Sequence, residues 1–191
     1  IRRGRLRGMT EPLIRVPDVQ FERAKLMLDR ARWAASRMQK LDGPAVRRIC
    51  DAAAAAGHAK AQHYAEWAVR ETGMGVAEHK RMKNEACSKG LVELYAHEDF
   101  ISPRIDNARK IVELPRPAGV IFALIPVTNP VATIFFKTLL ALMTRNAIIL
   151  SPHPQAKACC ADAGRLLAEA ARVAGAPDGA VQVIDEPNIP L

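Results

Sequence analysis

The stretch Val120-Ile-Phe-Ala-Leu-Ile-Pro-Val-Thr-Asn-Pro130 decides the fold class. Its first six residues form a continuous apolar run, as in a strand that is buried on both faces of a sheet. Its last five residues form a short loop with a proline at each end, and the mostly apolar segment Thr133–Met143 then predicts a helix. A buried strand followed by a short loop and a helix favours an α/β fold with a parallel sheet.

The same succession of elements continues toward the carboxyl terminus. Ala147–Leu150 and Val181–Ile184 predict two more buried strands, and Ala156–Ala174 between them predicts a helix. Strands that alternate with helices in this way form a parallel sheet with right-handed crossovers. Nucleotide-binding sheets usually contain more than three strands, so we expect this sheet to be incomplete and the chain to be a fragment.

The amino-terminal part of the chain has a different pattern of apolar residues. Helical spacing of apolar residues predicts three helices, over Val19–Met38, Pro44–Glu71 and Val76–Leu94. The short segments Asp99–Arg104 and Lys110–Leu114 flank a turn-prone sequence and predict a β-hairpin. The expected order is therefore helices, a hairpin and then the parallel sheet.

Composition limits the classes of protein that remain. With 191 residues and 49% hydrophobic content, the chain can bury the core of one domain. No apolar run approaches the roughly 18 residues that span a bilayer, so we expect a soluble protein with no membrane partner. The four cysteines show no CxxC spacing and are interpreted as reduced structural thiols, which indicates a cytoplasmic location.

Half of the net charge of +8 comes from four arginines in the short arm Ile1–Gly8. We interpret residues 1–18 as a solvated basic arm or linker ahead of one domain over residues 19–191. Translation could begin at Met9, or the arm could join a longer chain. A nucleic-acid partner is not expected, because such a binder would require an affinity that falls steeply with salt and depends on the arm.

No metal site is expected. His58 and His63 lie five residues apart, which does not place both on one face of a helix. Cys159 and Cys160 are adjacent on a predicted helix and point about 100° apart, so both cannot serve one site.

The candidate site lies where ligands collect in parallel sheets, at the carboxyl ends of the strands. The loop Pro126–Pro130 follows the first strand and Ser151–Pro154 follows the second, and each opens a helix. Amides at the start of a helix attract phosphate or a developing oxyanion. The alternatives are that Thr128 or Asn129 is simply a helix cap, and that His153 is an exposed loop residue.

Three separated motifs resemble those of a known family. They are the segment Arg116–Pro130, the pair Phe136-Lys137, and Thr144-Arg-Asn-Ala-Ile-Ile-Leu-Ser-Pro-His-Pro154. Together with Arg70–Gly75 and Ala174–Pro177, they closely resemble the acylating branch of the aldehyde dehydrogenase superfamily. The likeness is greatest to the aldehyde dehydrogenase half of bifunctional aldehyde–alcohol dehydrogenases and to related coenzyme A-acylating enzymes.

This resemblance implies a fold and a reaction. The fold is an aldehyde dehydrogenase-like α/β fold with amino-terminal helices, an incomplete Rossmann-like parallel sheet and a β-hairpin, residues 99–114, that acts as an oligomerisation arm. The reaction converts a short-chain aldehyde, NAD and coenzyme A to acyl-coenzyme A and NADH through a cysteine thioester. The nucleophilic cysteine and the catalytic domain would lie beyond Leu191, and a homo-oligomer is expected.

The resemblance also implies residue roles. Ordinary aldehyde dehydrogenases hold the oxyanion with an asparagine between two prolines. Alignment of those prolines with Pro126 and Pro130 places Thr128 under that asparagine and Asn129 one step later, so the catalytic role stays open between the two. Asn129 is favoured because an amide is the better donor. The residues implied to contact the cofactor are Ile125, Pro126, Val127, Ser151, His153 and Pro154, with Lys137 either near the site or solvated.

In the same alignment, Ser151 takes the place of a lysine that commonly contacts the adenosine ribose, which leaves the choice between NAD and NADP open; NAD is the expected dinucleotide, with NADP as the alternative. Two readings compete on the sequence alone. The first is the amino-terminal part of a coenzyme A-acylating dehydrogenase, and the second is a non-catalytic module for oligomerisation or assembly that is derived from the same fold.

Overall fold

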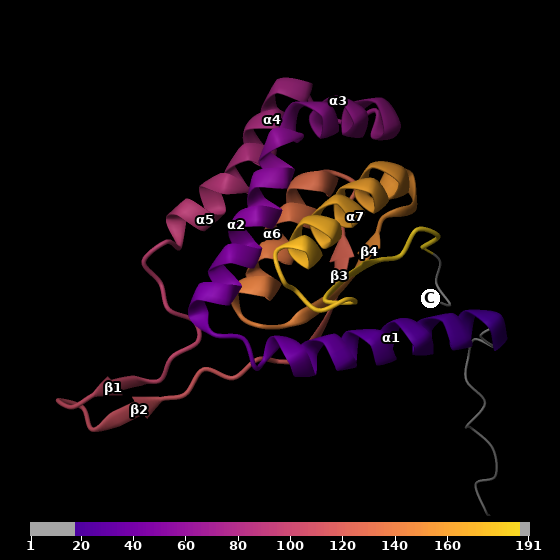
Figure 1. Cartoon of the computed structure of the whole chain (residues 1–191). Coiled ribbons are helices and arrows are strands. Elements are labelled where there is room, and N and C mark those ends of the chain that lie inside the picture. Colours follow the sequence, from indigo (N-terminus) through magenta and orange to yellow (C-terminus); the bar gives the residue numbers. More distant parts are fainter. Residues whose placement is uncertain (1–17, 188–191) are drawn as a thin grey trace, which may run out of the picture.

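The computed structural model describes residues 18–187, and the basic arm expected over residues 1–18 lies almost entirely outside them. The amino-terminal part of the described chain is helical. A two-stranded hairpin follows it in the sequence, before the parallel sheet, and projects from the body of the molecule (Figure 1). The helices there are α1 (Asp18–Met38), α2 (Gly43–Ala59), α3 (Ala61–Thr72), α4 (Ala77–Ala86) and α5 (Lys89–Leu94). The hairpin consists of β1 (Arg104–Asp106) and β2 (Ile111–Glu113).

The second half of the chain forms the parallel sheet that the sequence predicts. Its strands are β3 (Val120–Ile125), β4 (Ala147–Pro152) and β5 (Val181–Val183), hydrogen-bonded in the order β3-β4-β5. Helices α6 (Pro130–Met143) and α7 (Lys157–Val173) connect them, with a 3-10 turn, η1 (Pro154–Ala156), before α7. Both strand pairs are parallel, so the predicted α/β fold class is confirmed.

Helices cover both faces of this sheet. Helix α1 packs across β3, β4 and β5 on one face, and α6 and α7 pack on the other (Figure 1). Helix α2 forms a further layer against α6 and α7. Strand β3 is one of the two edge strands of the described sheet, and its side chains Phe122 and Leu124 are 54% and 68% exposed. Such an exposed apolar edge is unusual in a finished sheet.

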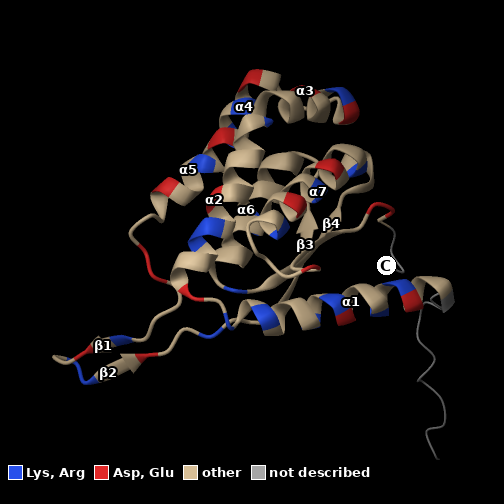
Figure 2. Cartoon of the chain, viewed as in Figure 1, with Lys and Arg blue, Asp and Glu red and all other residues tan. Residues whose placement is uncertain are grey.

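Helix α1 buries small residues along one stripe. Ala31, Ala34, Ala35 and Met38 are at most 3% exposed, at the i, i+3, i+4 and i+7 spacing of an amphipathic helix. Basic and acidic residues are both spread along the rest of the helix, and both signs of charge also occur on α4 and α5 (Figure 2). The outer side of α1 also carries apolar side chains, since Val19, Phe21, Leu26 and Trp33 are 54% to 78% exposed.

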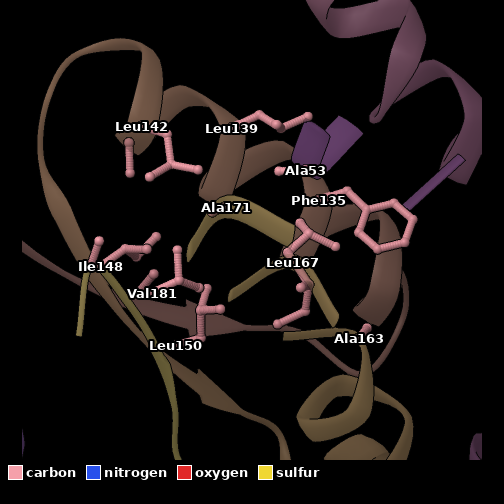
Figure 3. Packing of buried hydrophobic residues seen from close by; sticks show 14 of the residues in the cluster. Ala53, Phe135, Leu139, Leu142, Ile148, Leu150, Ala163, Leu167, Ala171 and Val181 are labelled. Carbon is pink, nitrogen blue, oxygen red and sulfur yellow. The ribbon is translucent and has the colours of Figure 1, made fainter. Parts of the chain in front are cut away.

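The core lies between the sheet and helices α2, α6 and α7 (Figure 3). Large side chains such as Phe135 of α6 and Ile148 of β4 share this core with small residues such as Ala53 of α2 and Ala163 of α7. At Gly164 of α7 a Cβ atom would lie 3.1 Å from Cβ of Val183, so the glycine permits close contact between α7 and β5. Alternation of large and small residues gives the dense packing of a protein interior.

Two predicted helices are each divided. The expected helix Pro44–Glu71 breaks at Lys60, and in the second part, α3, the Tyr64 ring packs edge-on against Phe135, 6.0 Å between centroids. The expected helix Val76–Leu94 breaks before α5, where the buried Ser88 hydroxyl donates to the carbonyl of Asn84 over 2.7 Å. Side-chain bonds of this kind compete with the helical ladder.

The predicted hairpin is present, but its first strand lies later in the chain than the sequence predicts. Asp99–Arg104 was expected to be a strand, whereas β1 begins only at Arg104. Oδ1 of Asp99 instead accepts hydrogen bonds from the amides of Ile101 and Ser102, at 2.8 and 2.9 Å, and so forms a turn.

Within residues 18–187, no helix has the length and hydrophobicity needed to cross a membrane.

Candidate active site at the carboxyl edge of the sheet

The loop after β3 and the end of β4 lie beside each other at the carboxyl edge of the sheet. The parallel register pairs Ile125 with Pro152. The amide of His153 extends this pairing, since it donates to the carbonyl oxygen of Ile125 over 3.0 Å. Residues 126–129 and 151–154, which the sequence assigns to one site, are therefore brought together.

Asn129 stands directly before helix α6 but does not cap it with its side chain. Its main-chain carbonyl accepts hydrogen bonds from the amide and the hydroxyl of Thr133, at 3.2 and 2.6 Å. Its side-chain oxygen Oδ1 accepts a hydrogen bond from Nζ of Lys83 over 2.9 Å. Asn129 therefore occupies the N-cap position before Pro130, as the alternative interpretation predicts, but its side chain makes no capping hydrogen bond and is held by α4 instead.

Thr128 is also held by α4, through its main chain. Nζ of Lys80 donates to the carbonyl oxygen of Thr128 over 2.8 Å. Lys80 is only 7% exposed, and this burial, followed by the nearby charge of Lys83, lowers the pKa of its ammonium group. Among the described residues, none forms a hydrogen bond with the Thr128 hydroxyl. The loop thus has a fixed main chain at Thr128 and a fixed side chain at Asn129.

Neither lysine is among the site residues predicted from the sequence. They lie three residues apart, hence on one face of α4, which is a usable signal. However, they precede the loop by 48 and 46 residues, and only the tertiary structure brings them to it.

A glycine makes room for the buried lysine. Gly75 precedes α4 with φ of +80°, a conformation that favours glycine. A Cβ atom at this position would lie 3.2 Å from Cε of Lys80. The Thr72–Gly75 turn therefore gives α4 both its direction and the space for the Lys80 side chain.

The start of helix α7 is not open to an anion. Oε1 and Oε2 of Glu71 accept hydrogen bonds from the amides of Ala158 and Cys159, at 2.7 and 2.8 Å. The expectation that both helix starts offer amides to a ligand is therefore wrong for α7, because a carboxylate of the chain already occupies that position.

The residues expected to contact the cofactor differ in accessibility. Pro126, His153 and Pro154 are exposed, and Val127 and Ser151 are half-buried. Ile125 is 3% exposed, so its side chain belongs to the core.

His153 has a local structural role. Its Nδ1 accepts a hydrogen bond from the amide of Gln155 over 3.2 Å and so caps η1. Cofactor contact by these residues stays a prediction.

Lys137 reaches the edge of the sheet. Its Nζ donates to the carbonyl oxygen of Leu124 over 2.7 Å. Because the next carbonyl, that of Ile125, faces β4, the Leu124 carbonyl points to the other side of β3. Lys137 is therefore neither free in solvent nor bonded to the loop side chains.

None of the four cysteines resembles an activated nucleophile. Cys50, Cys159 and Cys160 are buried and Cys87 is half-buried, all as free thiols. Burial raises the pKa of Cys50 to about 12, with the charge of Asp51 as a second cause, and burial also raises the pKa of Cys87. The pKa of Cys159 is raised by its hydrogen bond with Cys160 and by burial. A catalytic thiol requires the opposite shift.

A cavity of about 440 Å³ lies elsewhere, between α2 and the segment 95–101. It reaches Met143, the last residue of α6, and so lies toward the amino-terminal edge of the sheet. One of its lining side chains, Arg47, is engaged, since it donates to the carbonyl of Ala96 over 2.8 Å. Within residues 18–187, no group of three or more histidine, cysteine, aspartate or glutamate side chains could hold a metal ion.

A parallel sheet with helices on both faces and a polar loop at its carboxyl edge defines a Rossmann-like α/β protein. Residues 8–189 match the aldehyde dehydrogenase family, and the chain belongs to this family.

Among the relatives, the bifunctional aldehyde-alcohol dehydrogenase AdhE of Escherichia coli is 39% identical over 128 residues, which are 66% of this chain and 14% of that protein. The acetylating acetaldehyde dehydrogenase EutE of Salmonella typhimurium is 34% identical over 167 residues, 85% of this chain and 35% of that protein. The crystal structure of an acetylating aldehyde dehydrogenase from Geobacillus thermoglucosidasius superposes with a TM-score of 0.86 at 33% identity, over 90% of this chain and 38% of that one. The chain therefore spans about a seventh to two fifths of the length of these proteins.

Proposed function

We propose that the protein containing this chain is a coenzyme A-acylating aldehyde dehydrogenase. It converts a short-chain aldehyde, NAD and coenzyme A to acyl-coenzyme A and NADH, and residues 19–191 form the amino-terminal part of its NAD-binding domain. The observation that carries the proposal is the loop at the carboxyl edge of the sheet, where the Asn129 amide is fixed by α4, in a chain of the aldehyde dehydrogenase family.

The chemistry assigns a defined task to this loop. A cysteine thiolate adds to the aldehyde carbon, and the carbonyl oxygen becomes negatively charged. Loss of a hydride from that carbon to NAD gives a thioester, and the thiol of coenzyme A then takes the acyl group and regenerates the cysteine. A preorganised donor that faces the developing oxyanion stabilises both addition steps. We assign this donor to the amide nitrogen of Asn129, with Thr128 as the alternative.

The nucleophile is proposed to lie outside residues 1–191. In this chain, the pKa values of Cys50, Cys87 and Cys159 are all raised, which is unfavourable for a thiolate at neutral pH. The exposed apolar side chains Phe122 and Leu124 on the edge strand are consistent with further structure of the whole protein beside β3.

NAD is the proposed dinucleotide. Ser151 is half-buried at the carboxyl edge and has a hydroxyl that can bond a ribose hydroxyl, but it has no charge to attract the extra phosphate of NADP. Pro126, Val127, His153 and Pro154 lie beside it with accessible surface. The start of α7 is occupied by Glu71, so these residues are assigned to the adenosine side rather than to the pyrophosphate.

The test uses the whole protein that contains this chain. Short aldehydes, NAD and coenzyme A should give NADH and acyl-coenzyme A together, and N129A should lower kcat by about 100- to 1,000-fold, as for the loss of one oxyanion donor. T128A should change kcat much less. If the whole protein forms no acyl-coenzyme A and binds neither NAD nor coenzyme A, the proposal of an enzyme fails and the alternative, a non-catalytic assembly module, replaces it.

We also propose that the hairpin is an oligomerisation arm of a homo-oligomer. Ile105, Val112 and Leu114 are 68%, 57% and 57% exposed on a hairpin that projects from the body (Figure 1). A hairpin of two three-residue strands has little stability on its own, so a partner would support it. Replacement of Ile105 and Val112 by serine should shift the protein to a smaller assembly in analytical ultracentrifugation, and an unchanged assembly would exclude this role.

A further inference from the structure

The Lys83 contact defines how the Asn129 amide is oriented. An ammonium group has three donors and no acceptor, so the atom that faces it at 2.9 Å must be the amide oxygen Oδ1. The amide nitrogen Nδ2 is consequently directed away from Nζ of Lys83. No residue in the range 18–187 accepts a hydrogen bond from this nitrogen, so both of its N–H donors are available to a ligand.

The loop that carries Asn129 is fixed at a second point. Lys80 bonds the carbonyl of the preceding residue, Thr128, at 2.8 Å, and the space for its side chain depends on Gly75. Asn84, one residue beyond Lys83, anchors α4 in turn, since its buried Nδ2 donates to the carbonyl of Ala61 over 2.9 Å. The main chain and the side chain of the loop are therefore both held by one helix that is itself tied to α3.

The charge of Lys83 also matters for the strength of the donor. A hydrogen bond from a cation to an amide oxygen withdraws electron density from the amide nitrogen, which makes its N–H groups better donors. The side chain of Thr128 has no comparable support among the described residues. This difference favours Asn129 over Thr128 as the donor.

We propose that Lys83 is a positioning residue for the reaction, which orients and polarises the Asn129 amide so that Nδ2 donates to the substrate oxygen. This inference rests on the proposed function. Lys83 itself does not contact the substrate, and Lys80 supports it by fixing the main chain of Thr128.

The central experiment is a double-mutant cycle in the whole protein. K83M should lower kcat by about 10-fold, the effect of one charge-assisted hydrogen bond, with little change in KM for NAD. K83R, which keeps a cationic donor, should recover most of the activity. In the N129A background, K83M should have no further effect, because the group that it positions is then absent.

Lys89 offers a matched control on the neighbouring helix. Its ammonium group lies 3.8 Å from Glu93 in an exposed i,i+4 pair, so K89M removes the same kind of side chain without contact with the loop. Its kcat should stay within about twofold of the wild-type value. Because Lys83 is exposed like Lys89, neither variant should unfold the protein.

A second measurement separates this inference from the proposed function. In NMR spectra of the 191-residue chain, K83M should shift the side-chain amide signals of Asn129, and K89M should not. Unshifted signals, an unchanged kcat in K83M, or an equal loss from K83M in wild-type and N129A backgrounds would each overturn the inference. If K83M shifts the Asn129 signals but the whole protein makes no acyl-coenzyme A, the proposed function and the catalytic role of Lys83 are overturned. The contact between Lys83 and Asn129 would then still stand.

Discussion

Two adjacent phenylalanines on α6 allow a direct test of the core. Phe135 is fully buried, while Phe136, its neighbour in sequence, is 40% exposed. The Phe135 ring packs against Gly57 of α2, where a Cβ atom would lie 3.3 Å from it, and edge-on against Tyr64. Truncation of a buried phenylalanine leaves a cavity that this close-packed region cannot fill, so F135A should destabilise the chain by about 3 to 5 kcal/mol.

The assay is urea unfolding of the 191-residue chain, followed by far-UV circular dichroism. With an m value of about 2 kcal/mol/M, F135A should lower the midpoint by roughly 1.5 to 2.5 M. F136A, the matched control, should cost about 1 kcal/mol or less, because much of that ring is already in contact with water. Equal losses from the two variants, or a loss below about 1 kcal/mol for F135A, would refute the described packing of α6 against α2.

Three further predictions concern other parts of the fold. Iodoacetamide at pH 8 should modify the half-buried Cys87 before Cys50, because the buried Cys50 thiol has a pKa of about 12 and should react only on unfolding. Peptide mass spectrometry measures the order of modification, and early modification of Cys50 would contradict its burial. Hydrogen bonds from Ser102, and to a smaller extent one from the amide of Ile101, lower the pKa of Asp99 to about 2. The ionised Asp99 carboxylate therefore contributes fully to stability above about pH 4, and this contribution is lost as the pH falls toward 2. The difference in unfolding midpoint between wild type and D99A should therefore be full at pH 6 and vanish near pH 2, and a constant difference would be inconsistent with this. Asn146 is 4% exposed and its Oδ1 accepts a hydrogen bond from the amide of Gly119 over 2.8 Å, so N146A should cost about 1 to 3 kcal/mol in urea unfolding, and a cost near zero would exclude this link between β3 and β4.

The strands and the fold class could be predicted from the sequence because they depend on local apolar runs. Val120–Ile125 and the strand that begins at Ala147 lie where the pattern predicts them. The break at Lys60 could not be predicted in this way, since the apolar pattern continues through it and α3 packs through long-range contacts such as that of Tyr64 with Phe135, 71 residues later in the chain. The turn at Asp99 was missed because side-chain bonds to nearby amides override a short strand-like pattern.

The candidate site shows a similar division. The loop Pro126–Pro130 could be found from its place after a buried strand, and the roles of Thr128 and Asn129 came from the family resemblance. The involvement of Lys83 and the capping of α7 by Glu71 could not be found, because both join residues that are 46 to 88 positions apart. Contacts of this range follow from the packing of α3 and α4 against α6 and α7 and not from any local pattern.

The measurement that most directly tests the central claim is the location of the acyl group on the enzyme. The whole protein, incubated with a short aldehyde and NAD but without coenzyme A, should accumulate a thioester that coenzyme A removes, as observed by intact-protein mass spectrometry. Peptide mapping should place this thioester on a cysteine outside residues 1–191. An acyl group on Cys50, Cys87, Cys159 or Cys160, or the absence of any thioester that coenzyme A removes, would contradict the assignment of this chain to an acylating dehydrogenase with its nucleophile elsewhere.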